Sequence, residues 1–303
     1  MRIYFLLLVA LLIPRLLPAQ PTANSSTRTN ALPRLRKQIV QIAQDIPGRV
    51  GVAASIVETG ESIEWHGDEP FPMQSVYKFP IAMAVLHQVD EGKLSLSQPV
   101  HVDPNEYVSQ KQHSPLRDKY PTGANVSVDE LLRLAVSESD GSASDVLMRL
   151  VGGSSVIMAY LKSLGIRRII VANTEKELGS DQTVQYRNWA KPAEAVALLT
   201  LLQKGMGLSA SSRSHLLQLM TDTETGLKRL KGQLPAGTIV AHKTGTSQTI
   251  NGITAATNDI GLITLPKNRH LAIAVFVADS KADSATREAV IARLAKAVWD
   301  AWK

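Results

Sequence analysis

The chain has 303 residues and a formal net charge of +6, with 44% hydrophobic and 20% charged residues. This composition excludes wholesale disorder, and 19 Gly with 15 Pro are too few for a fibrous protein. Cysteine is absent, which excludes disulfides, thiolate metal sites and a cysteine nucleophile. Aromatic residues make up only 5% and do not interleave with a basic stripe, so we expect no nucleic-acid partner.

Residues 1–19 have the pattern of a secretory signal peptide. Arg2 lies near the start, an apolar run extends over residues 5–13, and the small Ala19 ends the segment. The apolar run is shorter than the ~20 residues that cross a bilayer. We therefore expect cleavage after Ala19 and a periplasmic or secreted protein without membrane contact. An uncleaved membrane anchor is the alternative.

Hydrophobic periodicity predicts the secondary structure of the remaining chain. The predicted helices, in chain order, are Leu32–Ile46, Ser75–Val89, Val128–Val136, Ala143–Val151, Ser155–Leu164, Pro192–Lys204 and Ser284–Trp302. The predicted strands are Val50–Val57 and Ser62–Trp65, joined as a hairpin, followed by Thr238–Ala241, Gly252–Thr257, Ile260–Thr264 and Leu271–Val277.

Strands near both ends of the chain, with helices between them, predict an α+β fold. We expect one antiparallel sheet flanked by helices, in an α/β domain formed by residues 20–73 and 222–303. Residues 74–221 are then an inserted, all-α domain. A cleft between two such domains is a common place for an active site.

Ser75 and Lys78 are three residues apart at the start of a predicted helix, so their side chains share one face. A desolvated lysine can take the proton of a serine and make it a nucleophile. Lys78 lies in an otherwise apolar stretch, where a charge needs a partner. Free N–H groups at the helix start would favour an oxyanion beside Ser75. The alternative is a capping serine next to a solvated lysine.

Two more polar motifs follow. Ser139-Asp140-Gly141 lies between two predicted helices, where it can present a hydroxyl to a cleft or can be a capping turn only. Residues 242–247, His-Lys-Thr-Gly-Thr-Ser, follow a predicted strand. Lys243 on an edge strand can hold a substrate carboxylate, and Gly245 permits close approach of a flat substrate to the backbone. The alternative is a polar strand end with a turn.

Ser-x-x-Lys, Ser-Asp-Asn and Lys-Thr-Gly form the motif set of class A β-lactamases and penicillin-binding proteins. Here Ser75-x-x-Lys78, Ser139-Asp140-Gly141 and Lys243-Thr244-Gly245 occur in that order, with Gly141 in the place of the Asn. Over residues 31–303 the chain resembles class A serine β-lactamases, in the branch of the PER and VEB extended-spectrum enzymes. The segments that carry this resemblance are Phe71-Pro72-Met73-Gln74-Ser75, Gln185-Tyr186-Arg187-Asn188-Trp189, Arg229-Leu230-Lys231-Gly232 and Ala241-His242-Lys243-Thr244-Gly245-Thr246-Ser247.

The resemblance implies hydrolysis of β-lactam antibiotics through a serine acyl-enzyme. It implies Ser75 as the nucleophile, Lys78 as a candidate base and Ser139 as the relay of a proton to the leaving nitrogen. Lys243 would assist Ser139 and attract the substrate carboxylate, and the backbone N–H groups of Ser75 and Thr246 would form the oxyanion hole. The implied substrate-binding residues are Thr244, Gly245, Thr246, Arg229, Gly141 and His113.

The resemblance also implies a base for deacylation. The family pattern Glu-x-x-Leu-Asn, in an omega-shaped loop near residues 173–189, matches Glu175 and Leu178. A solvated loop acid is the alternative for Glu175. Glu177 is one residue out of this register, so we expect it on the solvated surface.

Three positions depart from the family pattern. Gly141 replaces an Asn whose amide binds the substrate side chain, and Gly179 replaces an Asn that helps hold the hydrolytic water. Glycine supplies no side-chain hydrogen bond, so both departures bear on turnover and substrate range. His113 stands where many members carry an aromatic gate, and it is either a substrate contact or a surface imidazole.

A D,D-peptidase or penicillin-binding protein that acylates but deacylates slowly is the alternative function, and a β-lactam-binding sensor domain is a third. The Glu-x-x-Leu segment favours the hydrolase. The 7 His residues show no metal-ligand spacing. We therefore expect no metal or other cofactor, a small-molecule β-lactam as the partner, and a monomer.

Overall fold

The computed structural model describes residues 31–181 and 183–303, so the predicted signal peptide lies outside the described residues. The helices are α2 (Ala31–Gln44), α3 (Lys78–Asp90), α4 (Pro115–Lys119), α5 (Val128–Val136), α6 (Gly141–Leu150), α7 (Ser154–Ser163), α8 (Glu175–Leu178), α9 (Pro192–Gln203), α10 (Ala210–Thr221) and α11 (Ser284–Trp302). Short 3₁₀ helices are η1 (Gln74–Tyr77), η2 (Pro104–Glu106), η3 (Val184–Tyr186) and η4 (Pro266–Asn268). The strands are β1 (Arg49–Ile56), β2 (Ser62–Trp65), β3 (Phe71–Pro72), β4 (Pro99–Val102), β5 (Ala124–Ser127), β6 (Ile169–Ile170), β7 (Trp189–Ala190), β8 (Val240–Thr246), β9 (Thr249–Ile250), β10 (Ile253–Leu265) and β11 (Arg269–Ser280).

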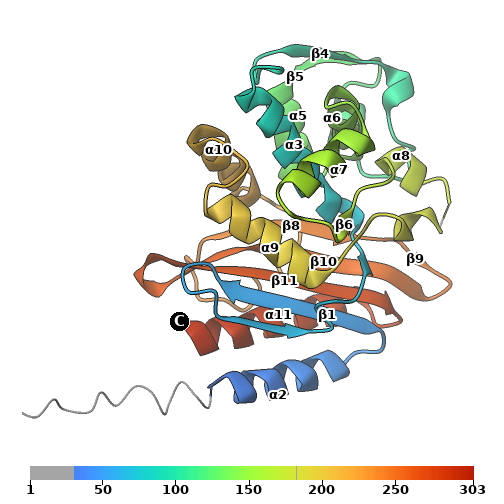
Figure 1. The fold of residues 1–303 in the computed structure, drawn as a ribbon. Helices are drawn as coiled ribbons and strands as arrows, with labels where there is room; N and C mark the ends of the chain where they lie inside the picture. The colour runs from blue at the N-terminus through green and yellow to red at the C-terminus, as the bar shows by residue number, and fades with distance from the viewer. Residues whose placement is uncertain (1–30, 182) are drawn as a thin grey trace, which may run out of the picture.

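The main sheet is antiparallel and has six strands, in the order β2-β1-β11-β10-β8 with β9 paired to β10. β1 pairs with β11, so that Arg49 lies opposite Ala278. The sheet therefore combines segments from near both ends of the described chain (Figure 1). β8 is an edge strand, as the sequence predicts for the strand that carries Lys243.

Both faces of this sheet are buried because its central strands alternate between two apolar sets. In β11, residues 271, 273, 275 and 277 are Leu, Ile and two Val, and they pack in one core with α2 and α11. Residues 272, 274 and 278 are Ala, and with Phe276 they face a second core that includes α9. Figure 1 shows α2 and α11 on one side of the sheet and the other helices on the opposite side.

The second core continues from the sheet into the helical part of the molecule. Its centre is α3, in which every residue from Lys78 to Leu86 is buried. α5, α6 and α7 surround α3. Two small antiparallel sheets complete the fold, β3-β7-β6 and β4-β5. The predicted α+β architecture is confirmed, but residues 74–221 are not all-α as predicted, because β4, β5, β6 and β7 lie among them.

The structure corrects several predicted boundaries. The predicted strand 238–241 is β8, which begins at Val240 and continues through the Lys-Thr-Gly motif to Thr246. The predicted strands 252–257 and 260–264 are one strand, β10. The predicted helix 75–89 divides into η1 and α3, and α10 was not predicted.

Among the described residues, no single helix is long and apolar enough to cross a bilayer. Only α6 and α7 together reach the required length and hydropathy, and they are bent by 74° at their break.

Candidate active site

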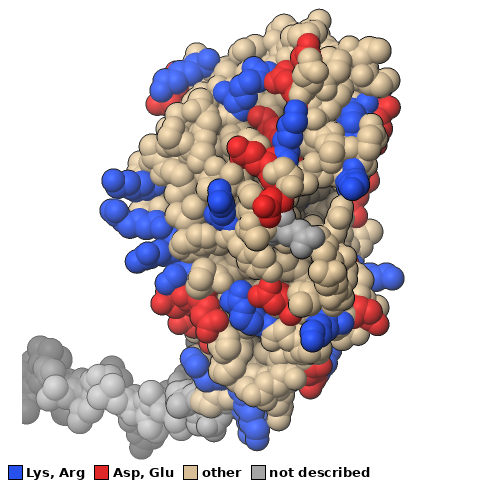
Figure 2. All heavy atoms as spheres, turned by 90° about the vertical axis from the view of Figure 1, so that its right-hand side faces the viewer, with Lys and Arg blue, Asp and Glu red and all other residues tan. Residues whose placement is uncertain are grey.

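A cleft of about 560 Å³ opens between edge strand β8 and the helical part of the molecule. Its lining includes the predicted site residues Ser75, His113, Ser139, Glu175, Arg229, Thr244 and Thr246. The structure thus brings together residues that the three motifs and the omega-like loop supply. A second depression, of about 490 Å³ between β1, β2 and α9, contains none of the predicted site residues in its lining. On the face that carries α8 and β9, basic and acidic side chains are dispersed among uncharged ones (Figure 2).

The candidate nucleophile Ser75 lies in the 3₁₀ turn η1, immediately before α3. Gln74 adopts a left-handed φ of 47° and bonds Gln185 of the omega-like loop through its side chain, at 2.8 Å. β8 passes very close to this turn at Gly245, where an added Cβ would lie 2.2 Å from the carbonyl oxygen of Met73. Glycine is therefore required at position 245, because any side chain would push the edge strand away from Ser75.

Ser139 links the helical part to β8. Lys243 Nζ donates to Ser139 Oγ at 2.9 Å, and Ser139 has a φ of 63°. Asp140 caps α6 by accepting from the Ala143 N–H at 2.8 Å. The motif is therefore a capping turn and also presents its serine to the cleft. Complete burial, and next the charge of Lys78, hold the pKa of Lys243 well below its ordinary value.

Lys78 is 1% exposed and has polar partners on two sides. Its Nζ donates to the carbonyl oxygen of Ser139 at 2.7 Å and lies 3.4 Å from Glu175 Oε2. These contacts explain how a charged side chain fits into an apolar helix. They also place the cation between the Ser139 turn and the omega-like loop.

Glu175 is the first residue of α8 and reaches the cleft from the omega-like loop. Its backbone N–H donates to Asp145 Oδ1 at 2.6 Å. Its Oε2 accepts a hydrogen bond from the Tyr77 hydroxyl at 2.7 Å. Glu177 is on the surface as expected, but it also completes a capping box with Thr174, which fixes the start of α8.

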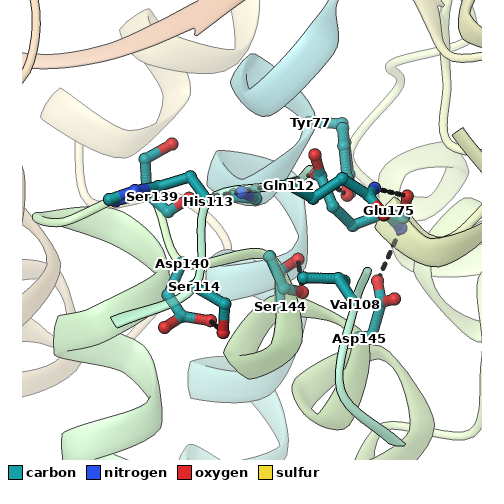
Figure 3. A network of polar contacts seen from close by, with 12 residues as sticks. Tyr77, Val108, Gln112, His113, Ser114, Ser139, Asp140, Ser144, Asp145 and Glu175 are labelled. Carbon is teal, nitrogen blue, oxygen red and sulfur yellow. Dashed lines mark hydrogen bonds and ion pairs between the residues drawn. The ribbon is translucent and has the colours of Figure 1, made fainter. Parts of the chain in front are cut away.

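The two departing glycines both lie near Glu175, and in each case a neighbouring side chain occupies the space that a Cβ would need. A Cβ at Gly141 would lie 2.7 Å from Glu175 Cγ, and a Cβ at Gly179 would lie 2.3 Å from the Gln112 amide carbon. Gln112 donates through its Nε2 to the Glu175 carbonyl oxygen, and its Oε1 accepts from Ser109 Oγ at 3.0 Å. Gly141 is itself buried under Glu175. Figure 3 shows Tyr77, Gln112 and Asp145 converging on Glu175.

The remaining predicted residues line the β8 side and the rim of the cleft. Arg229 is 5% exposed, and its Nη2 donates to Thr246 Oγ1 at 2.7 Å. Its Nε donates to Glu288 at 3.2 Å. Thr244 shares a hydrogen bond of 2.6 Å with Thr225. The exposed His113 contacts the carbonyl oxygen of Glu138 through Nε2, at 2.9 Å.

Sequence reasoning missed four side chains of this region, which are Tyr77, Gln112, Asp145 and Thr225. Tyr77 stands inside the Ser-x-x-Lys motif, so its position beside two candidate catalytic residues was a usable signal. The other three come from segments without a motif. Within residues 31–181 and 183–303, no group of three or more His, Asp or Glu side chains has the geometry of a metal site.

The chain is similar to known proteins over most of its length. Residues 34–302 match the family described as the β-lactamase enzyme family. The β-lactamase VEB-1 of Pseudomonas aeruginosa is 41% identical over 254 residues, which are 83% of this chain and 85% of that protein. The extended-spectrum β-lactamase PER-1 of Pseudomonas aeruginosa is 44% identical over 277 residues, 91% and 90% of the two chains. A crystal structure of a β-lactamase from Chitinophaga pinensis has a TM-score of 0.87 and 45% identity, covering 89% of this chain and 100% of that one.

Proposed function

The chain belongs to the β-lactamase enzyme family, and from this membership we propose that it hydrolyses β-lactams by a two-step reaction on Ser75. The observation that carries the proposal is the position of Glu175 in the same cleft as Ser75, with its carboxylate 3.4 Å from Lys78 Nζ. This arrangement supplies both a nucleophile and a second base, which an enzyme needs to make and then to hydrolyse an ester.

In the first step, Lys78 gives a proton to the Glu175 carboxylate, 3.4 Å away, and its amine, the candidate base, takes the proton of Ser75 Oγ as this oxygen attacks the lactam carbonyl carbon. The oxyanion that forms is held by the backbone N–H groups of Ser75 and Thr246. The lactam C–N bond then breaks, Ser139 passes a proton to the nitrogen, and Lys78 replaces that proton and regains its own from Glu175. The 2.9 Å hydrogen bond from Lys243 supports this role for Ser139. Arg229 and Lys243 provide positive charge for the substrate carboxylate, beside Thr244 and Thr246.

In the second step, Glu175 takes a proton from water, and the water oxygen attacks the ester carbonyl carbon. The ester bond to Ser75 breaks, and its oxygen regains a proton. The named relatives are β-lactamases, so the slowly deacylating penicillin-binding protein is not favoured. Because one relative is named an extended-spectrum enzyme, we also propose that bulky oxyimino cephalosporins are substrates.

Two further proposals concern the whole protein. We propose export by the signal peptide of residues 1–19, with a monomeric periplasmic or secreted product. We also propose an α/β domain of residues 20–73 and 222–303 and a helical domain of residues 74–221, with the site at their boundary. The dispersed surface charges favour a small substrate over a polyanion (Figure 2).

The test follows turnover and the covalent state of the purified protein by stopped-flow absorbance and mass spectrometry. A chromogenic cephalosporin and an oxyimino cephalosporin serve as substrates. We expect no adduct with Ser75→Ala. With Glu175→Gln we expect a stable adduct and deacylation slower by about 10²–10⁴-fold, the usual contribution of a general base. Normal turnover of Glu175→Gln would contradict the assignment of the base.

A further inference from the structure

A buried hydroxyl next to the nucleophile is bonded to the candidate base. Tyr77 is 0% exposed and follows Ser75 by two residues in the same 3₁₀ turn. Its hydroxyl donates to Glu175 Oε2 at 2.7 Å, a short bond of the kind formed with charged acceptors. A tyrosine with its oxygen buried needs such a partner, and here the partner is a cleft residue supplied by a loop almost a hundred residues away.

Because Tyr77 is uncharged, its hydroxyl is always the donor in this hydrogen bond and Glu175 is always the acceptor. Burial, and next the negative charge of Glu175, raise the pKa of Tyr77 well above its ordinary value. The hydroxyl therefore keeps its proton at every working pH. It can act on the carboxylate as a fixed donor and takes no proton from it.

The two contacts of Glu175 Oε2 come from one piece of backbone. The hydroxyl of Tyr77 and the ammonium of Lys78 belong to consecutive residues, and both reach the same oxygen. Gly141 supplies the space for this arrangement, because Glu175 Cγ lies where a side chain at position 141 would begin. The turn that carries Ser75 thus also holds the carboxylate, whose other oxygen has no hydrogen bond within the described residues.

From these contacts we propose that Tyr77 is a positioning residue for deacylation, which fixes the orientation of the Glu175 carboxylate relative to Ser75. The inference rests on the proposed role of Glu175 as the base. Without the hydroxyl, the 3.4 Å contact with Lys78 is the remaining polar contact of Oε2 within the described residues, and the carboxylate is held less firmly.

The experiment compares Tyr77→Phe with the unchanged protein in single-turnover and steady-state kinetics. We expect deacylation to slow by about 10-fold, because a hydrogen bond to a charged group contributes at least that much. kcat and KM should fall together, while kcat/KM, which reports acylation, changes little.

Four other charged or polar groups lie near Glu175, and they are Lys78, Lys243, Asp145 and, at the rim, His113. All four remain in Tyr77→Phe, so the difference between the two deacylation rates reports the hydroxyl. Tyr160→Phe is the matched control, because it removes a hydroxyl that donates to Gly207 O at 3.1 Å, outside the cleft lining.

The outcomes separate this inference from the proposed function. If Glu175→Gln stalls as the adduct and Tyr77→Phe keeps its deacylation rate, kcat and KM, the positioning role is overturned and the base assignment stands. If Glu175→Gln turns over normally, the base assignment itself is overturned. Equal losses of thermal stability in Tyr77→Phe and Tyr160→Phe, with no change in kinetics, would also overturn the inference.

Discussion

At Gly179 a side chain from another loop fills the space that a larger residue would occupy. The Gln112 amide lies over this glycine and holds the carbonyl oxygen of Glu175. From the sequence alone, Gly179 indicates only the loss of the side-chain hydrogen bonds of an Asn. The compensating residue, Gln112, could not be predicted because it stands 67 positions earlier in a segment without a motif. A side chain at position 179 therefore requires the Gln112 amide to move.

The clash between a side chain at position 179 and the Gln112 amide predicts that substitutions at the two positions affect each other. Gly179→Asn should slow deacylation because its Cβ would lie within 2.5 Å of the amide atoms of Gln112 and displace them from Glu175. Gln112→Ala should slow it as well, while the double variant should recover much of the rate. We expect a coupling of about 1–2 kcal/mol, as is usual for residues in contact. Single-turnover deacylation rates of the four proteins give this value.

If the effects of Gly179→Asn and Gln112→Ala on the deacylation rate were additive in the double variant, the predicted coupling between the two positions would be wrong. Gln88→Ala is the control, because it removes an amide that donates to a backbone carbonyl, that of Val151 at 2.9 Å, away from the cleft lining. It should alter stability without altering deacylation.

Among the elements, those with plain apolar periodicity were predicted from the sequence, whereas β10, which carries buried polar residues, was predicted as two strands. The hairpin of β1 and β2 and helix α11 were predicted within a few residues. β10 was divided at Asn258-Asp259, which resembles a turn. In the structure, both side chains are buried, with Asn258 donating to Pro72 O and Asp259 contacting His242. Such pairings depend on tertiary partners, and the hydrophobic periodicity of a segment gives no information about them.

The same limit applies to the site. The Ser75, Ser139 and Lys243 motifs identified the cleft because each combines a polar residue with a predicted element. α10 was missed because the first half of its sequence holds three Ser, an Arg and a His, and its large apolar residues lie only in the second half. Asp145 was missed because its role is to receive the N–H groups of Glu175 and Lys176 at the start of α8.

Asp145 gives the omega-like loop a pH dependence. Burial raises its pKa to about 7 despite two backbone donors, against 3.8 ordinarily. The folded protein thus binds this proton more tightly than the unfolded chain. The stabilisation from this bound proton is complete at a pH below the ordinary pKa of 3.8. It is lost as the pH rises through the folded pKa of about 7. We expect the free energy of unfolding to fall over this interval, with a slope approaching about 1.4 kcal/mol per pH unit.

Denaturant titrations from pH 4 to 8 measure this slope. Asp145→Asn should flatten it, because the amide cannot titrate. Asp283→Asn is the control, since its helix-capping hydrogen bond lowers the pKa of Asp283 and its contribution is lost as the pH falls. An unchanged slope in Asp145→Asn would assign the pH dependence to another group.

At the scale of the whole molecule, one apolar core crosses the proposed domain boundary. It includes Ala53, Ile260 and Phe276 of the sheet together with α3, α5 and α6. Neither part can separate without exposing this shared surface to water. The helical domain is therefore an insertion in sequence but not an independent body in packing.

We expect the protein to unfold in a single calorimetric transition. The van't Hoff and calorimetric enthalpies should agree, because the shared core couples the two parts. Two resolved endotherms, or early loss of helix with the sheet intact by circular dichroism, would show that the domains unfold separately.

The pairing of β1 with β11 also controls when the active site can exist. Arg49 and Asp279, which are bonded at the ends of these two strands, are 230 residues apart. During synthesis the β1–β2 hairpin must wait, with an open edge, until almost the entire chain has been made. Long-range pairing of this kind folds slowly. If the chain is exported as we propose, this topology delays folding while the chain crosses the membrane. The active site then forms only after export, when β10 and β11 have joined the sheet.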